Sequence, residues 1–178
     1  MSEQLQAYLA DLHSVVNDTT RPLENRVHHA FLIFRNQVKE RKEVLLSQAG
    51  AAALKYVLNT TETSSQDTAI HLRAEMDGLD TGLDRLDGEW RHRTSPEAFL
   101  QSAVRTLLSI EKYYQEDAES RALKIVALDK ESKAYLEGRR EVLRSNQIAE
   151  AIKAMLIMFK EAVKPLVQEL SFAPSTTQ

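Results

Sequence analysis

The chain has 178 residues, a hydrophobic fraction of 43% and a formal net charge of −3 at pH 7. This length and apolar content suit one folded domain with a buried core, and the near-neutral charge disfavours a general nucleic-acid-binding surface. Cysteine is absent, which excludes disulfides, thiolate nucleophiles and cysteine-based metal centres, and is consistent with a cytoplasmic protein.

Apolar residues recur at steps of three and four along most of the chain. This spacing places them on one side of an α-helix and requires a partner helix against that side. The four longest series are Leu23–Leu45, Leu72–Trp90, Ala103–Tyr135 and Ile148–Leu170. Together with few glycines and prolines, they predict an all-α fold: an elongated helical bundle of four to six helices with long antiparallel coiled-coil-like pairs, in a single domain over residues 1–178.

The N-terminal third is predicted to contain two helices, the first over residues 2–17. Thr20 is expected to cap the second helix, with Pro22 in its first turn, where a missing N–H costs little. We expect this helix to run to about Ser47, with Gly50 either ending it or only weakening it. Residues 59–67 follow as a polar loop, because none of them carries a large apolar side chain.

A third helix is predicted over residues 68–93, although it contains three glycines, Gly78, Gly82 and Gly88. Each glycine weakens a helix by roughly 1 kcal/mol relative to alanine, so packing must hold this one. The sharpest boundary in the chain follows it. Ser95 is the expected N-cap and Pro96 the first residue of the next helix.

Residues 96–145 permit two interpretations. They form either one continuous helix or two helices separated by a break near Leu128–Asp129, since no strong helix breaker occurs. The last helix is expected to run from Ser145 to Leu170, with a bend at Pro165. Residues 171–178 are expected to be a frayed tail.

Two charged stripes flank the apolar series, and both advance in steps of three and four. The acidic stripe is Asp77, Asp80, Asp84 and Asp87, and the basic stripe is Arg35, Lys39 and Lys42. The two stripes could pair across antiparallel helices, within one chain or across a dimer, and so set the alignment of those helices. Alternatively, the basic stripe could meet a partner, an anionic lipid surface or nucleic acid. We favour pairing, because no aromatic interleaving or glycine-rich loop supports nucleic acid.

Three Glu/His pairs lie at helical spacing: Glu24/His28, His71/Glu75 and Glu89/His92. The last is an E-x-x-H element, which di-iron helical bundles supply from two helices. Because the chain has one copy of it, Glu89 and His92 are weak metal candidates, and we favour surface pairs without metal. No cofactor is expected.

The chain contains none of the nucleophile, phosphate-loop or dinucleotide motifs that mark common enzymes. We therefore predict a non-enzymatic helical interaction or assembly protein that forms a homodimer and binds a partner protein through a helix face. Two alternatives remain: a peripheral membrane-binding helical dimer that uses the basic face, and a helical carrier of metal or a small ligand. We expect no signal segment or membrane span, since no stretch reaches about 20 apolar residues.

Overall fold

The structure is a computed structural model that describes residues 3–58 and 63–172. Within these ranges the chain forms five α-helices and no strands. The helices are α1 (Glu3–Asn17), α2 (Leu23–Leu58), α3 (Thr63–Arg91), α4 (Pro96–Ile125) and α5 (Lys133–Phe172). The predicted all-α class and the helical bundle are confirmed.

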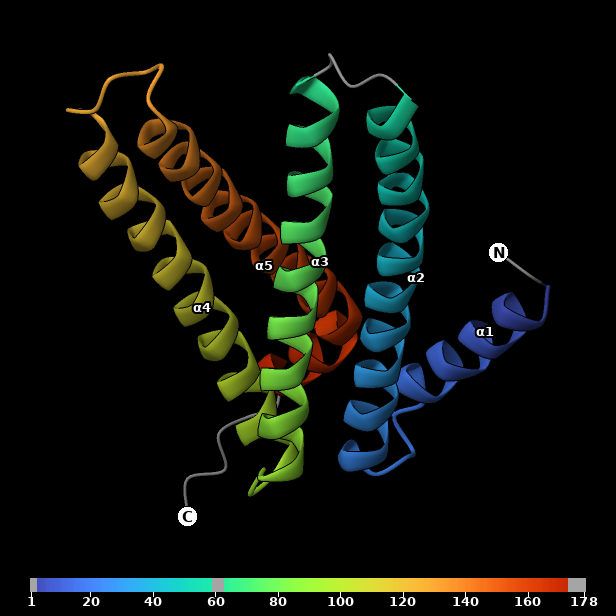
Figure 1. Cartoon of the computed structure of the whole chain (residues 1–178). Coiled ribbons are helices and arrows are strands. Elements are labelled where there is room, and N and C mark those ends of the chain that lie inside the picture. The colour runs from blue at the N-terminus through green and yellow to red at the C-terminus, as the bar shows by residue number, and fades with distance from the viewer. Residues whose placement is uncertain (1–2, 59–62, 173–178) are drawn as a thin grey trace.

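The helices form two antiparallel hairpins, α2–α3 and α4–α5, and α1 leans against the beginning of α2 (Figure 1). α5 contacts each of the other four helices and crosses behind α3. The two hairpins lie close together near the end where α3 passes into α4. They separate toward the opposite end, which carries the connection between α4 and α5 (Figure 1). Because the hairpins diverge, one side of α3 is covered by the α4–α5 hairpin over only part of its length (Figure 1).

Aromatic side chains form the centre of the core where the hairpins meet. Neighbouring rings have centroids 4.9 to 6.0 Å apart, a range typical of favourable aromatic pairs. The cluster comprises Phe31, Phe34, Trp90, Phe99 and Phe159. The prediction that Trp90 is a packed residue of the apolar series is confirmed, since its ring lies against the buried core while remaining partly accessible.

The junction between α1 and α2 differs from the predicted cap. Asp18 Oδ1 accepts hydrogen bonds from the Thr20 N–H at 3.1 Å and from Thr20 Oγ1 at 2.6 Å, so Thr20 closes a turn onto Asp18. α2 begins after Pro22, whose carbonyl accepts the Arg26 N–H at 3.3 Å. Arg26 is buried, and its Nε donates to the Val16 carbonyl at 2.9 Å, which satisfies an end group of α1.

The predicted end of α2 near Ser47 is wrong, because the helix continues to Leu58. Gly50 lies inside it, exposed and without neighbouring atoms that a side chain would meet. The alanines on both sides of Gly50 have the highest helix propensity of any residue and offset its cost.

The predicted polar loop over residues 59–67 is partly wrong, because α3 begins at Thr63. Polar residues without a breaker can continue a helix whose later turns are packed. The predicted tail over 171–178 also begins too early, because α5 includes Ser171 and Phe172. Residues 59–62 and 173–178 lie outside the described residues.

The predicted start of α4 is confirmed. Ser95 Oγ accepts the Ala98 N–H at 3.1 Å, and Pro96 occupies the first turn. The predicted start of the last helix at Ser145 is wrong. α5 begins at Lys133, and its actual cap is Ser132, whose Oγ accepts the Tyr135 N–H at 3.1 Å.

Of the two interpretations of residues 96–145, the structure has the break near Leu128–Asp129. The apolar series Ala103–Tyr135 is therefore divided between two antiparallel helices. Ser145 is buried in the middle of α5, where its Oγ donates to Asp117 Oδ2 on α4 at 2.6 Å. A serine can serve as a helix cap or as an interior donor, so the local sequence did not distinguish the two roles.

Glycines in α3 permit a close crossing with α5. A Cβ added to Gly78 would lie 2.8 Å from the Ala151 Cβ and 3.1 Å from the Ile148 carbonyl oxygen. A Cβ on Gly82 would lie 2.6 Å from the Met155 sulfur. These glycines therefore bring the two helix backbones together, while Gly88 has no atom within 4 Å of such a Cβ. Packing holds α3 together, as its low intrinsic propensity requires.

Candidate partner-binding grooves along α3

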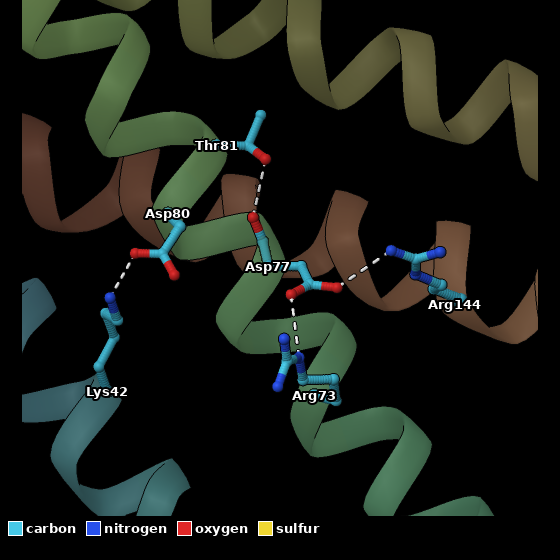
Figure 2. A network of polar contacts seen from close by, with 6 residues as sticks. All are labelled: Lys42, Arg73, Asp77, Asp80, Thr81 and Arg144. Carbon is cyan, nitrogen blue, oxygen red and sulfur yellow. Dashed lines mark hydrogen bonds and ion pairs between the residues drawn. The ribbon is translucent and has the colours of Figure 1, made fainter.

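The predicted pairing of the charged stripes occurs within the chain, between α2 and α3. Lys42 forms an ion pair with Asp80 (Figure 2), and Arg35 lies 3.4 Å from Asp87. Both ion pairs fit the same antiparallel alignment of α2 and α3, because a step of seven residues back along α2 matches a step of seven residues forward along α3. Lys39 and Asp84 form no ion pair with any residue that the structure describes. Two residues of the basic stripe, Arg35 and Lys42, therefore form ion pairs within the chain. Their positive charges are less available to bind lipid or nucleic acid.

We expect the Lys42–Asp80 pair to contribute about 0.2–1 kcal/mol, because both side chains retain solvent exposure. The test is a double-mutant cycle by urea unfolding with Lys42→Glu, Asp80→Lys and their combination. The double variant should recover most of the stability that either single variant loses. Lys39→Glu is the matched control and should show no coupling to Asp80→Lys. Equal coupling for Lys39 and Lys42 would contradict the observed register.

α3 is joined by polar contacts to α5 as well. Asp77 accepts from Arg73 Nε at 3.3 Å and from Arg144 at 3.1 Å, one guanidinium on each carboxylate oxygen (Figure 2). One turn further along α3, Thr81 Oγ1 donates to the Asp77 carbonyl at 2.8 Å. Asp77 therefore holds Arg144 of α5 beside α3, a role that its place in the acidic stripe did not predict.

A second set of contacts joins α2, α3 and α5. Glu75 on α3 accepts from Arg41 Nε on α2 at 2.7 Å and from the Gln147 amide on α5 at 3.4 Å. His71 Nδ1 lies 3.1 Å from the Gln147 amide oxygen, so this nitrogen carries the proton in the hydrogen bond. These contacts fix α3 between its two neighbours and account for the His71/Glu75 pair as structural.

A groove of about 510 Å³ lies between α3 and α5, where the hairpins begin to separate. Its α3 wall presents two alanines and an isoleucine, and arginines stand on both sides. The lining residues are Ala69, Ile70, Arg73, Ala74, Asp77, Arg140, Glu141 and Arg144. We call it the α3–α5 groove.

A second groove, of about 460 Å³, lies between α3 and α4. It combines two tyrosines with hydroxyl groups and one arginine. Its lining residues are Thr81, Arg85, Glu89, Thr106, Ser109, Ile110, Tyr113 and Tyr114. Within this groove Glu89 accepts from Thr106 Oγ1 at 3.0 Å, and the Tyr113 side chain is 63% exposed. We call it the α3–α4 groove.

The two grooves follow one another along a single face of α3. Their α3 residues advance by about one turn at a time from Ile70 to Glu89, and the Thr81–Asp77 hydrogen bond lies where they meet. The nineteen residue steps from Ile70 to Glu89 span about 29 Å at about 1.5 Å per residue. The combined face is long enough to contact several turns of another helix.

The wall opposite α3 is the α4–α5 hairpin, which polar contacts hold together. Asp117 accepts from Ser145 Oγ and from Arg121 Nε, both at 2.6 Å, and Arg121 also approaches Glu141 at 3.4 Å. The hydrogen bond from Ser145, and then that from Arg121, lower the pKa of Asp117 below the usual range of an aspartate. The ionised carboxylate therefore stabilises the hairpin.

This pKa shift predicts a pH dependence of the hairpin's stability. Because the folded-state pKa of Asp117 lies below the unfolded value of about 3.9, its contribution is complete above about pH 5 and disappears as the pH falls through the folded-state pKa. Urea unfolding of wild type and Asp117→Asn from pH 6 to 3 should give a stability difference that narrows below about pH 4. A difference independent of pH would contradict this role.

The metal candidates are placed in separate environments. Glu89 bonds with Thr106, His92 is exposed just beyond the end of α3, and Glu24 accepts from Arg93 at 2.7 Å. His28 lies against Trp90, with ring centroids 5.4 Å apart. Among the residues that the structure describes, no three or more metal-ligating side chains form a cluster.

Sequence reasoning missed most residues of these grooves. Arg144 and Arg140 were assigned to the end of a helix preceding α5, so nothing placed them beside α3. Tyr113 is not a member of the apolar series Ala103–Tyr135, and its exposure follows only from the tertiary structure. Contacts between residues about 70 positions apart cannot be inferred from the periodicity of one chain.

The described residues thus form a bundle of five helices with an open, mixed apolar and arginine-lined face along α3. No protein-family model matches the chain, and neither a curated protein nor a solved structure is detectably similar to it. Within the described residues, no helix is both long and apolar enough to cross a membrane.

Proposed function

We propose that this protein is a non-enzymatic helical interaction protein that binds a segment of a partner protein along α3. The observation that carries the proposal is the succession of the α3–α5 and α3–α4 grooves on one face of α3. Helical bundles commonly hold partner helices in grooves of this kind, by apolar contacts with polar groups at the edges. Tyr113 supplies an exposed aromatic side chain of the type enriched at interfaces.

Site-specific photo-crosslinking tests this proposal. A benzophenone amino acid replaces Tyr113 in the α3–α4 groove, and the matched control replaces Tyr8, an exposed tyrosine on α1, away from the grooves. In its native cells, the Tyr113 variant should give a discrete adduct with another protein that the Tyr8 variant does not give. The same adducts at both positions, or none at Tyr113, would overturn the proposal.

The predicted homodimer stays a prediction, but its basis changes. Most of the apolar series of α5 is buried within the chain, although Ile157 and Val167 remain exposed. Exposed apolar side chains on α2, among them Val44, Leu46 and Leu54, also support self-association. Light scattering should give a mass near twice 20.2 kDa, and a mass near 20.2 kDa at micromolar concentration would exclude the dimer.

The two alternative functions receive less support. A membrane-binding face would require free basic residues on α2, but Arg35 and Lys42 are paired with aspartates. A metal carrier would require ligands that converge, but Glu89 and His92 are not joined by further ligands among the described residues. A cytoplasmic location remains part of the proposal.

A further inference from the structure

Arginine side chains dominate the polar edges of both grooves. Together the linings contain four arginines, Arg73, Arg85, Arg140 and Arg144, and three acids, Asp77, Glu89 and Glu141. A guanidinium carries five N–H donors and no acceptor, whereas a carboxylate can only accept. Whether the grooves favour an acidic or a basic partner therefore depends on how many of the carboxylate oxygens already accept hydrogen bonds within the chain.

Each of the three acids has a hydrogen-bond or ion-pair partner. Asp77 receives one guanidinium on each oxygen, Glu89 receives the Thr106 hydroxyl, and Glu141 lies 3.4 Å from Arg121, which is outside both grooves. Their capacity to attract a further cation is reduced by these contacts.

The arginines, in contrast, retain donors that face solvent. Arg73 and Arg144 remain 76% and 50% exposed although each contacts Asp77. Arg85 is exposed in the α3–α4 groove and forms no ion pair with any residue in the described part of the chain. An incoming carboxylate would thus find unused guanidinium donors in both grooves.

The apolar part of the grooves restricts the shape of the partner. Ala69 is a small, partly exposed residue that allows another backbone to approach α3 closely, and Ile70 and Ile110 supply larger apolar contacts. The walls are helices, so they offer no strand edge to which an extended peptide could add. A helix with apolar residues every three or four positions matches the spacing of this face.

We infer that the partner segment is an acidic amphipathic helix, which places apolar side chains against α3 and carboxylates beside Arg73, Arg85 and Arg144. This inference rests on the proposed function and deepens it. The proposed function leaves the charge of the partner open, and this inference makes it negative. Arg73, Arg85 and Arg144 would then determine which partner binds.

Two synthetic peptides of about 18 residues test the charge preference. Both carry leucines at the same helical spacing, and one has glutamates and the other lysines at the flanking positions. Titration into the full-length protein, labelled with ¹⁵N and followed by NMR, reports both affinity and the position of binding. We expect the glutamate peptide to bind about tenfold more tightly and to shift amides of Thr81, Thr106 and Ile110.

Variants then locate the effect. Arg85→Gln and Arg144→Gln, one from each groove, should together weaken binding of the glutamate peptide about tenfold. Arg105→Gln is the matched control: Arg105 is exposed on α4 but does not line either groove, so affinity should change less than about twofold. Melting curves of the wild type, the double variant and Arg105→Gln check that each protein is folded.

Several outcomes would overturn the inference. Equal binding of both peptides, or equal losses from the groove variants and Arg105→Gln, would show that carboxylates are not recognised there. Amide shifts confined to the α2 face around Lys39 would assign anion binding to the basic stripe. These results are distinguishable from failure of the proposed function: a Tyr113 crosslink with no peptide charge preference would retain the interface and remove only the acidic partner.

Discussion

Replacing Trp90 with alanine is expected to lower the free energy of unfolding by about 3–5 kcal/mol. The indole contacts Phe99 and Phe31 at centroid distances of 4.9 and 5.6 Å, and the Arg93 guanidinium lies 3.7 Å from its centroid. Removal of the ring therefore leaves a cavity where α2, α3 and α4 meet. Each kcal/mol lowers the melting temperature by roughly 2–4 °C in a protein of this size.

Thermal and urea unfolding measure the effect, and Tyr8→Ala, an exposed aromatic truncation on α1, is the control with an expected change below about 0.5 kcal/mol. If Trp90→Ala does not fold, Trp90→Phe replaces it and should cost less. His28 gives an independent readout, because burial, with the positive charge of His29, lowers its pKa. Loss of the neighbouring indole should raise the pKa of His28 toward its ordinary value. An unchanged melting curve and histidine titration would refute the packing role.

Substituting Gly78 with alanine is expected to destabilise the protein by about 1–3 kcal/mol, although alanine is the better helix former. The added methyl would approach the Ala151 Cβ to 2.8 Å and the Ile148 backbone to 3.1–3.2 Å, so the α3–α5 crossing must widen. Because Arg144 and Arg140 reach the α3–α5 groove from α5, this widening should also weaken binding along α3.

Gly88→Ala is the matched control in the same helix. Its Cβ would meet no atom within 4 Å, so the gain in helix propensity should stabilise the protein by up to about 1 kcal/mol. Combining Gly78→Ala with Ala151→Gly should cost less than the sum of the two single changes, since the second removes the nearest contact of the added methyl. If both single glycine variants were stabilised equally, the close crossing would be disproved.

The charge pairing that holds α2 beside α3 was predictable from local pattern. The acidic and basic stripes advance in steps of three and four along two helices, and the structure pairs Lys42 with Asp80 and Arg35 with Asp87. The grooves were not predictable, because they depend on Arg144 and Tyr113 lying near α3. That proximity requires the α4–α5 break and the crossing at Gly78, and neither has a unique local signal.

The sequence by itself determined the all-α class, the cap at Ser95 and the packed position of Trp90, because helical periodicity and capping act over a few residues. Tertiary structure alone decided where the long helices end. α2 continues through Gly50, whose cost the flanking alanines offset, and α5 begins at Lys133 rather than Ser145, because Ser145 is held inside the α4–α5 hairpin by its hydrogen bond to Asp117. The open face of α3 depends on the close α3–α5 crossing at Gly78 and on the divergence of the two hairpins beyond it, and both arise from contacts between residues far apart in the sequence.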